Sequence, residues 1–205
     1  MILFVFEGKK REPRIFNSLR QLYFKDEAVV CFTFETAFHS LFKELKANDW
    51  DLFPILRKKY RERQDDSLEG YIESDFSEIY LFFDYDFHIN DKHIRLSEWN
   101  NELKEMLAFF SNEGENGKLY ISYPMVEAIR YTQQLPDASY YKYTVRREDC
   151  TRFKDMAAKF SFYIGLNFID ITTNDNIEEV KQNWQILRDQ NVKKANYICY
   201  FSMII

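Results

Sequence analysis

Three acidic residues stand directly after two apolar runs and are of the type that binds a divalent cation. Glu7 follows ILFVF (2–6), and Asp84 and Asp86 follow EIYLFF (78–83). Side chains two residues apart on an extended chain point the same way, so Asp84 and Asp86 are expected on one side of their strand. A few carboxylate oxygens with room for water and a phosphate form the kind of site that Mg²⁺ prefers.

The repulsion between these carboxylates is the reason to expect a cation. Neighbouring strands lie about 4.8 Å apart, and two carboxylates about 4 Å apart repel by roughly 4 kcal/mol at an effective dielectric constant of about 20. Bound Mg²⁺ or Mn²⁺ would remove this cost and could orient a phosphodiester, with Glu7 as the candidate general acid or base. Acidic residues after strands are also common as caps and in turns, so a purely structural role without a metal ion stays open for DYD (84–86).

Strands and helices alternate along most of the chain. The strands are expected at 2–6, 27–34, 78–83 and 113–123, and the helices at 12–24, 35–48, 51–64, 96–112, 124–135, 147–165 and 176–192. This order predicts an α/β fold with a mostly parallel sheet and helices on both faces. Ligands of such sheets bind beyond the carboxyl ends of the strands, which is where the three acids stand.

Composition limits the classes of function. With 205 residues, 46% of them hydrophobic, the chain can bury a core, and its net charge of −5 excludes a polybasic binder. The three cysteines form no CxxC pair, which excludes that type of zinc site and fits a reducing compartment. No apolar run reaches the roughly 20 residues of a membrane span, and the N-terminus does not read as a signal peptide. We therefore expect a cytoplasmic protein.

Two groups of basic residues could meet an anionic ligand. One follows Glu7 and comprises Lys9, Lys10, Arg11 and Arg14. The other lies in an expected helix and comprises Arg57, Lys58, Lys59, Arg61 and Arg63. Either could contact phosphates, and either could be a solvated basic face.

Two weaker features also have two interpretations each. Arg146 and Arg147 follow the aromatic stretch YYKYTV (140–145), which could stack on bases or simply be buried. His88, two residues beyond Asp86, could contact the metal or a phosphate, and the alternative is a bystander in a turn.

Three segments together resemble a known family. FEGKKREPRIFNSL (6–19) resembles the first motif of TOPRIM-fold nucleases of the RloB-like and OLD-like groups, in which a strand ends in Glu-Gly and an EP-x-[YI]-F helix follows. FFDYDFH (82–88) resembles their DxD motif, and YISYPMVEAI (120–129) resembles the third RloB-like motif. The three occur in the order of the family and cover about residues 1–135.

The resemblance implies Mg²⁺-dependent cleavage of a phosphodiester in DNA or RNA. It implies an effector of bacterial anti-phage defence that works with an ABC-type ATPase, similar to the TOPRIM component of PARIS systems, and a homodimer is one option. By position, Glu7 matches the general acid/base, and Asp84 and Asp86 match the metal-binding pair. Glu127 matches the acid of the third motif and Glu12 the acid of the EP motif, in a role that supports the metal or the base.

The sequence also departs from the family, and two rival functions stay open. Arg11 stands where many members carry Thr or Asp, and 48–77, a helical insertion with an acidic connector, is longer than a compact core needs. We expect a catalytic domain at 1–135 and a mainly helical extension at 136–205. The rivals are a DxD-type phosphatase, whose DxD would follow the first core strand, and a non-catalytic TOPRIM-like subunit that docks on an ATPase.

Overall fold

The computed structural model of the chain describes residues 1–63, 66–85, 95–163 and 165–202. Its backbone forms two compact units. Unit 1 comprises Met1–Pro13 and Phe24–Met125, and unit 2 comprises Arg14–Tyr23 and Val126–Ile205.

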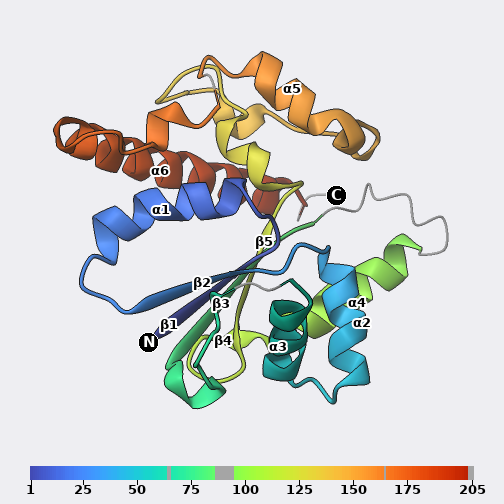
Figure 1. Cartoon of the computed structure of the whole chain (residues 1–205). Coiled ribbons are helices and arrows are strands. Elements are labelled where there is room, and N and C mark those ends of the chain that lie inside the picture. Colours follow the sequence, from blue (N-terminus) through green and yellow to red (C-terminus); the bar gives the residue numbers. More distant parts are fainter. Residues whose placement is uncertain (64–65, 86–94, 164, 203–205) are drawn as a thin grey trace. The chain divides into compact units, whose positions relative to one another are not determined.

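Unit 1 is built on a five-stranded sheet in the order β2-β1-β3-β5-β4 (Figure 1). The strands are β1 (Ile2–Phe6), β2 (Val29–Thr33), β3 (Glu78–Asp84), β4 (Ser111–Asn112) and β5 (Gly117–Ser122). All neighbouring pairs are parallel except β4 with β5, a two-residue antiparallel edge that the sequence did not predict. The α/β class and the mostly parallel sheet are confirmed, and β1 and β3 are direct neighbours.

One face of this sheet carries a core that three helices complete. The helices are α2 (Phe38–Ala47), α3 (Leu52–Arg63) and α4 (Leu96–Phe109), and Figure 1 shows them on one side of the strands. Leu3 and Val5 of β1 are fully buried in this core. On the helical side, Phe38 packs edge-on against Trp99, with ring centroids 4.5 Å apart. The continuous apolar run of β1 is explained by burial of both sets of its side chains.

The opposite side of the sheet carries a ladder of aromatic rings that runs across the strands. The Phe6 ring stacks on that of Phe82 at 5.6 Å between centroids, and Phe82 stacks on Tyr120 at 5.2 Å. Phe6 and Phe82 are direct partners in the β1–β3 register, and Phe82 and Tyr120 in the β3–β5 register. Such cross-strand pairs fix the register of a sheet, so the carboxyl ends of β1 and β3 are held level.

Unit 2 is mainly helical. It contains most of α1 (Arg11–Tyr23), together with α5 (Phe153–Phe160), α6 (Ile177–Ser202) and the short 3-10 helices η2 (Val126–Arg130), η3 (Tyr140–Lys142), η4 (Arg147–Arg152), η5 (Asn167–Ile169) and η6 (Asn174–Asn176). The Trp184 indole Nε1–H of α6 donates to the Ser18 hydroxyl of α1 at 2.8 Å, which ties these two helices together. Among the described residues, every helix is too short or too polar to cross a bilayer.

Three expected helices differ from the structure. The expected helix at 124–135 is wrong, because only the 3-10 helix η2 forms there. The helix expected at 147–165 is reduced to η4 followed by α5, and the helix expected at 176–192 continues to Ser202. In the first case a nearby carboxylate takes one backbone donor at the end of the segment: the Gln133 N–H donates to Asp137 Oδ2 at 3.1 Å. Side chains of this kind offer the backbone an alternative to the helix.

Asp137 organises this turn and is only 6% exposed. Its carboxylate also accepts hydrogen bonds from the Ser139 N–H at 2.8 Å, the Tyr143 hydroxyl at 3.0 Å and the Thr132 hydroxyl at 3.2 Å. Burial alone would raise the pKa of Asp137, but these hydrogen bonds outweigh it and hold the pKa below its ordinary value.

We predict from this lowered pKa that the protein loses stability in acid. A carboxyl group with a lower pKa in the folded state stabilises the fold above its unfolded pKa of about 3.9. That contribution is lost as the pH falls from there toward the folded pKa. Urea unfolding between about pH 6 and pH 3 should show a falling free energy of unfolding. Asp137→Asn should be less stable at pH 6 and should show a shallower fall; an unchanged pH dependence would contradict the assignment.

Candidate functional site

Glu7 and Asp84 lie side by side at the carboxyl edge of the sheet. The Glu7 N–H donates to the Phe82 carbonyl at 2.9 Å, which extends the β1–β3 pairing by one residue. The Glu7 carboxylate Oε2 accepts the Asp84 backbone N–H at 2.8 Å. Asp84 itself is 8% exposed. The structure therefore brings the Glu7 carboxylate to the backbone of Asp84, the first acid of the DxD.

The other predicted acids are placed differently. Asp86 and His88 lie outside the described residues. Glu127 belongs to unit 2, is 1% exposed, and has Lys154 Nζ at 3.8 Å from its Oε1. No three His, Cys, Asp or Glu side chains gather at metal-binding distance in the part of the chain that the structure describes. The metal site with Glu7, Asp84, Asp86 and Glu127 stays a prediction.

Glu12 supports the turn that follows β1. Its carboxylate Oε1 accepts the Gly8 N–H at 3.1 Å. A Cβ atom built on Gly8 would lie only 2.4 Å from Glu12 Oε2. A side chain at Gly8 would therefore push the Glu12 carboxylate, the flexible end of its side chain, away from the Gly8 N–H.

We predict that Gly8→Ala displaces the Glu12 carboxylate and costs about 1 kcal/mol, the usual value of one hydrogen bond. Glu12→Ala should cost a similar amount, and the double variant no more than either, because both remove the same contact. Chemical denaturation measures all three. Gly114→Ala is a matched control, since its Cβ would lie no closer than 3.7 Å to any neighbouring atom. Additive losses in the double variant would contradict this role for Glu12.

Glu35 is an acid at the same edge that sequence reasoning missed. It follows β2, its φ is a strained +61°, and its N–H donates to the Glu7 carbonyl at 2.8 Å. The Glu35 Oε1 lies 3.3 Å from Lys9 Nζ and 3.5 Å from Arg63 Nη1. The sequence placed Glu35 at the start of a helix, whereas α2 begins only at Phe38. The rule that selected Glu7, an acid directly after an apolar strand, would have found it.

The basic residues after Glu7 do not act as one group. Lys9 is 70% exposed at its side chain and pairs with Glu35 at the carboxyl edge. Lys10 is exposed, and Arg11 is the first residue of α1. Arg14 lies in unit 2, where its guanidinium binds Asp170 through Nε at 3.1 Å and through Nη2. The hydrogen bond to Asp170 raises the pKa of Arg14. Of the four, Lys9 has the clearest connection to the edge that holds Glu7.

The basic run on α3 mostly holds unit 1 together. The Arg63 guanidinium donates to the carbonyls of Thr33 and Phe34, at the carboxyl end of β2. Lys59 Nζ pairs with Glu44 of α2 at 3.1 Å. These contacts favour a structural role for the inward side of α3 over a role in ligand binding.

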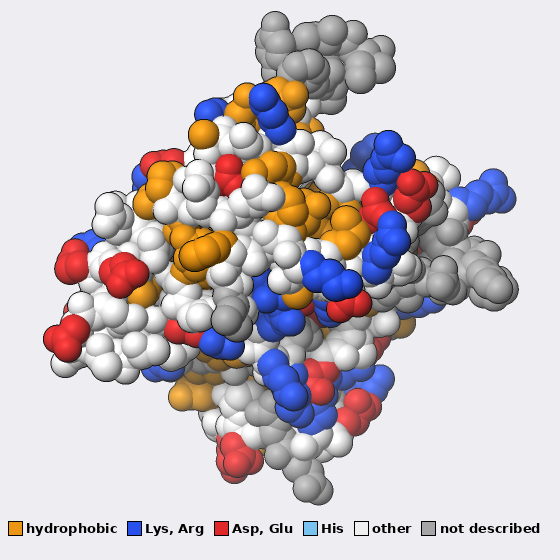
Figure 2. All heavy atoms as spheres, turned by 90° about the horizontal axis from the view of Figure 1, so that it is seen from above, with side chains coloured by type: hydrophobic (Ala, Val, Ile, Leu, Met, Phe, Trp, Pro, Cys, Tyr) orange, Lys and Arg blue, Asp and Glu red, His pale blue; other side chains and the backbone are white. Residues whose placement is uncertain are grey.

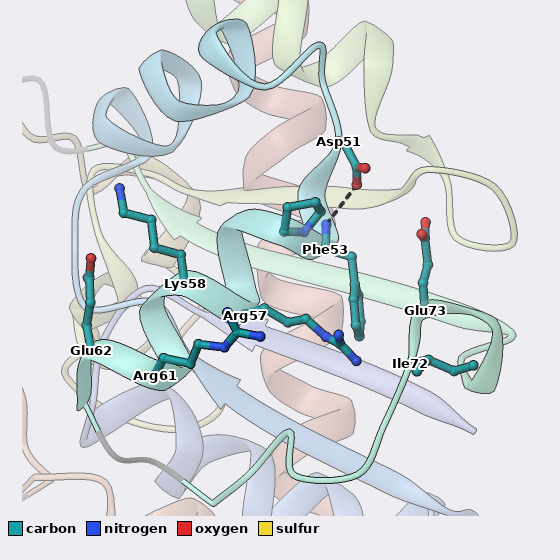
Figure 3. Close-up of a pocket in the computed structure, with 9 residues that line it drawn as sticks. Asp51, Phe53, Arg57, Lys58, Arg61, Glu62, Ile72 and Glu73 are labelled. Carbon is teal, nitrogen blue, oxygen red and sulfur yellow. Dashed lines mark hydrogen bonds between the residues drawn. The ribbon is translucent and has the colours of Figure 1, made fainter.

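The outward side of α3 borders a groove of about 620 Å³ (Figure 3). It is lined by Asp51, Phe53, Pro54, Arg57, Lys58, Arg61, Glu62, Ile72 and Glu73. The Arg57 guanidinium lies over the Phe53 ring, 5.5 Å from its centroid, and donates to the Tyr71 carbonyl at 2.9 Å. Three acidic side chains share this lining with three basic ones, so the charge of the groove does not select an anion.

Surface charge is mixed on the face shown in Figure 2, where Lys and Arg side chains are interspersed with Asp and Glu. This agrees with the net charge of −5. Any polyanion must therefore be bound by a local arrangement of cations or through a metal ion.

Comparison with known proteins returned no match, neither among protein-family models nor among curated proteins or solved structures. The edge at Glu7 and Asp84 and the sequence motifs are therefore the features that bear on function.

Proposed function

We propose that this chain is a Mg²⁺- or Mn²⁺-dependent phosphodiesterase that cleaves DNA or RNA, with a TOPRIM-like fold that has helices on both faces of its sheet. The observation that carries the proposal is the hydrogen bond from the Asp84 N–H to the Glu7 carboxylate at 2.8 Å. It supports the proposal because it joins the Glu-Gly motif and the DxD motif at one edge of a parallel sheet, where ligands bind in such folds.

The donor set fits a hard divalent cation, because it consists of carboxylate oxygens. Asp84 and Asp86 would hold the ion. When bound, the ion would supply charge stabilisation to the phosphate and its leaving oxygen. Glu7 would transfer the proton as general acid or base, and its hydrogen bond to the Asp84 N–H fixes its orientation. Lys9, beside this edge, would neutralise part of the phosphate charge.

The resemblance of the motifs supports a biological setting. We place the chain among cytoplasmic effectors of bacterial anti-phage defence that act with an ABC-type ATPase. In this setting the ATPase would control access to the nucleic acid, because the chain contains no Walker motif of its own.

A cleavage assay tests this function. The purified chain, alone and with a cognate ATPase where one adjoins its gene, is incubated with plasmid DNA, single-stranded DNA and total tRNA in Mg²⁺, Mn²⁺ or EDTA. We expect metal-dependent cleavage that EDTA abolishes. Hydrolysis of a small phosphate ester without cleavage of any nucleic acid would favour the phosphatase instead. Absence of all hydrolysis and of Mg²⁺ binding would favour the non-catalytic subunit.

A further inference from the structure

Three lysines of unit 2 place their ammonium groups over the rings of two consecutive tyrosines, Tyr140 and Tyr141. Lys142 Nζ and Lys193 Nζ lie 5.5 and 4.7 Å from the centroid of the Tyr141 ring. Lys194 Nζ lies 4.5 Å from the centroid of the Tyr140 ring. All three distances are within the roughly 6 Å range of cation–π attraction. We refer to Lys142, Lys193 and Lys194 as the lysine cluster.

The rings that carry the lysine cluster are fixed in place. The buried Tyr140 hydroxyl donates to Asn191 Oδ1 of α6 at 3.1 Å, which joins η3 to α6. The Tyr141 ring packs edge-on against Tyr197 of α6, with centroids 4.9 Å apart. Lys193 and Tyr197 are four residues apart on α6 and so share one helix face. The two rings over which the ammonium groups lie are therefore held in place by α6.

The lysine cluster forms no close ion pair in the part of the chain that the structure describes. None of its three members forms an ion pair with a carboxylate there, although ion pairs are frequent elsewhere on the surface of unit 2. Burial raises the pKa of Tyr140 to about 12, so its ring is neutral at physiological pH. Lys194 is half-buried, and this burial lowers the pKa of its ammonium group. Lys142 and Lys193 share the Tyr141 ring, and two like charges over one ring favour the approach of an anion.

We propose that the lysine cluster binds consecutive phosphates of a nucleic-acid strand. The choice of a nucleic acid as the anion rests on the function proposed above, and the requirement for a local group of cations follows from the net charge of −5. Because ammonium groups and Tyr197 already pack on the Tyr141 ring, the tyrosines position cations and do not serve as platforms for bases. The contact is therefore to the backbone and independent of base sequence.

Binding is measured by fluorescence anisotropy on the full chain carrying Glu7→Gln, so that cleavage does not interfere. The probes are a labelled single strand and a labelled duplex of equal length, titrated at several KCl concentrations. Adding Lys142→Gln, Lys193→Gln and Lys194→Gln should weaken binding about tenfold or more at 0.1 M KCl. It should also reduce the magnitude of the slope of log K, where K is the binding constant, against the logarithm of the KCl concentration by about two to three. Each lost phosphate contact lowers this slope by about 0.7–0.9.

Two comparisons separate this effect from bulk charge and from misfolding. Lys25→Gln, Lys104→Gln and Lys159→Gln together remove the same charge from exposed positions and should leave binding within about threefold of the parent. Replacing the lysine cluster by Arg should retain binding, because the charges remain. The triple variant could have a lowered melting temperature because Lys194 is partly buried. In that case the double variant Lys142→Gln with Lys193→Gln, which keeps Lys194, should still weaken binding.

Each outcome of the binding and cleavage assays either supports or overturns the inference. Equal weakening by both Gln triples, no change in either, or no binding by the Glu7→Gln parent would overturn the inference. So would binding of poly-glutamate, but not of nucleic acid, through the lysine cluster. If nucleic acid binds through the lysine cluster but the wild-type chain cleaves nothing with any metal, the proposed function fails and the inference stands.

Discussion

Glu7→Gln is expected to lower the rate of metal-dependent phosphodiester cleavage by about 10²–10⁴-fold, the usual contribution of a general acid or base. Gln has nearly the same shape, and its amide oxygen can still accept the Asp84 N–H, so the carboxyl edge should keep its geometry. What the substitution removes is the ability of residue 7 to transfer a proton. Single-turnover cleavage of the preferred substrate in Mg²⁺ measures the loss.

Two controls accompany this variant. Glu69→Gln also removes one negative charge, but at an exposed position, and this variant should cleave at the wild-type rate. The melting temperature of Glu7→Gln should stay close to that of the wild type. This would show that the lower cleavage rate comes from the loss of proton transfer and not from unfolding. Full activity in Glu7→Gln would remove Glu7 from the mechanism.

The largest expected effect on stability is that of Asp137→Ala, at about 3 kcal/mol. The carboxylate is buried and accepts hydrogen bonds from two backbone N–H groups and two hydroxyl groups. Removing it takes away the acceptor of these four hydrogen bonds, each worth about 1 kcal/mol. Urea unfolding at pH 7 measures the loss.

Asp175→Ala is the matched control for this stability prediction. Asp175 is exposed in η6 of the same unit, and its removal should change the free energy of unfolding by no more than about 0.5 kcal/mol. A loss below about 1 kcal/mol for Asp137→Ala would mean that the turn does not depend on this carboxylate.

Much of unit 1 could be predicted because its signals are local. The unbroken apolar run ILFVF indicated a strand buried on both faces, and that strand is β1 at Ile2–Phe6. The order of strands and helices predicted a mostly parallel sheet, and the sheet has that form. The position of Glu7 beside Asp84 followed from strand ends that meet at one edge.

Other features depended on contacts between distant residues. The segment 124–135 has helical spacing of its apolar residues, yet Asp137 draws the Gln133 N–H into a turn. Glu35 adopts a left-handed φ that no helix allows, and its backbone is held by Glu7, 28 positions earlier in the sequence. The lysine cluster joins η3 to α6, and no local pattern reveals that Lys193 lies over the Tyr141 ring.

The most direct test of the central claim is the position of a bound metal. Crystals grown with Mn²⁺ and a non-cleavable oligonucleotide give an anomalous signal from the ion. We predict a peak within about 2.0–2.3 Å of an Asp84 carboxylate oxygen, beside Glu7, and its loss in Asp84→Asn. A peak at a site that excludes both Asp84 and Glu7, in a protein that cleaves its substrate, would contradict the account.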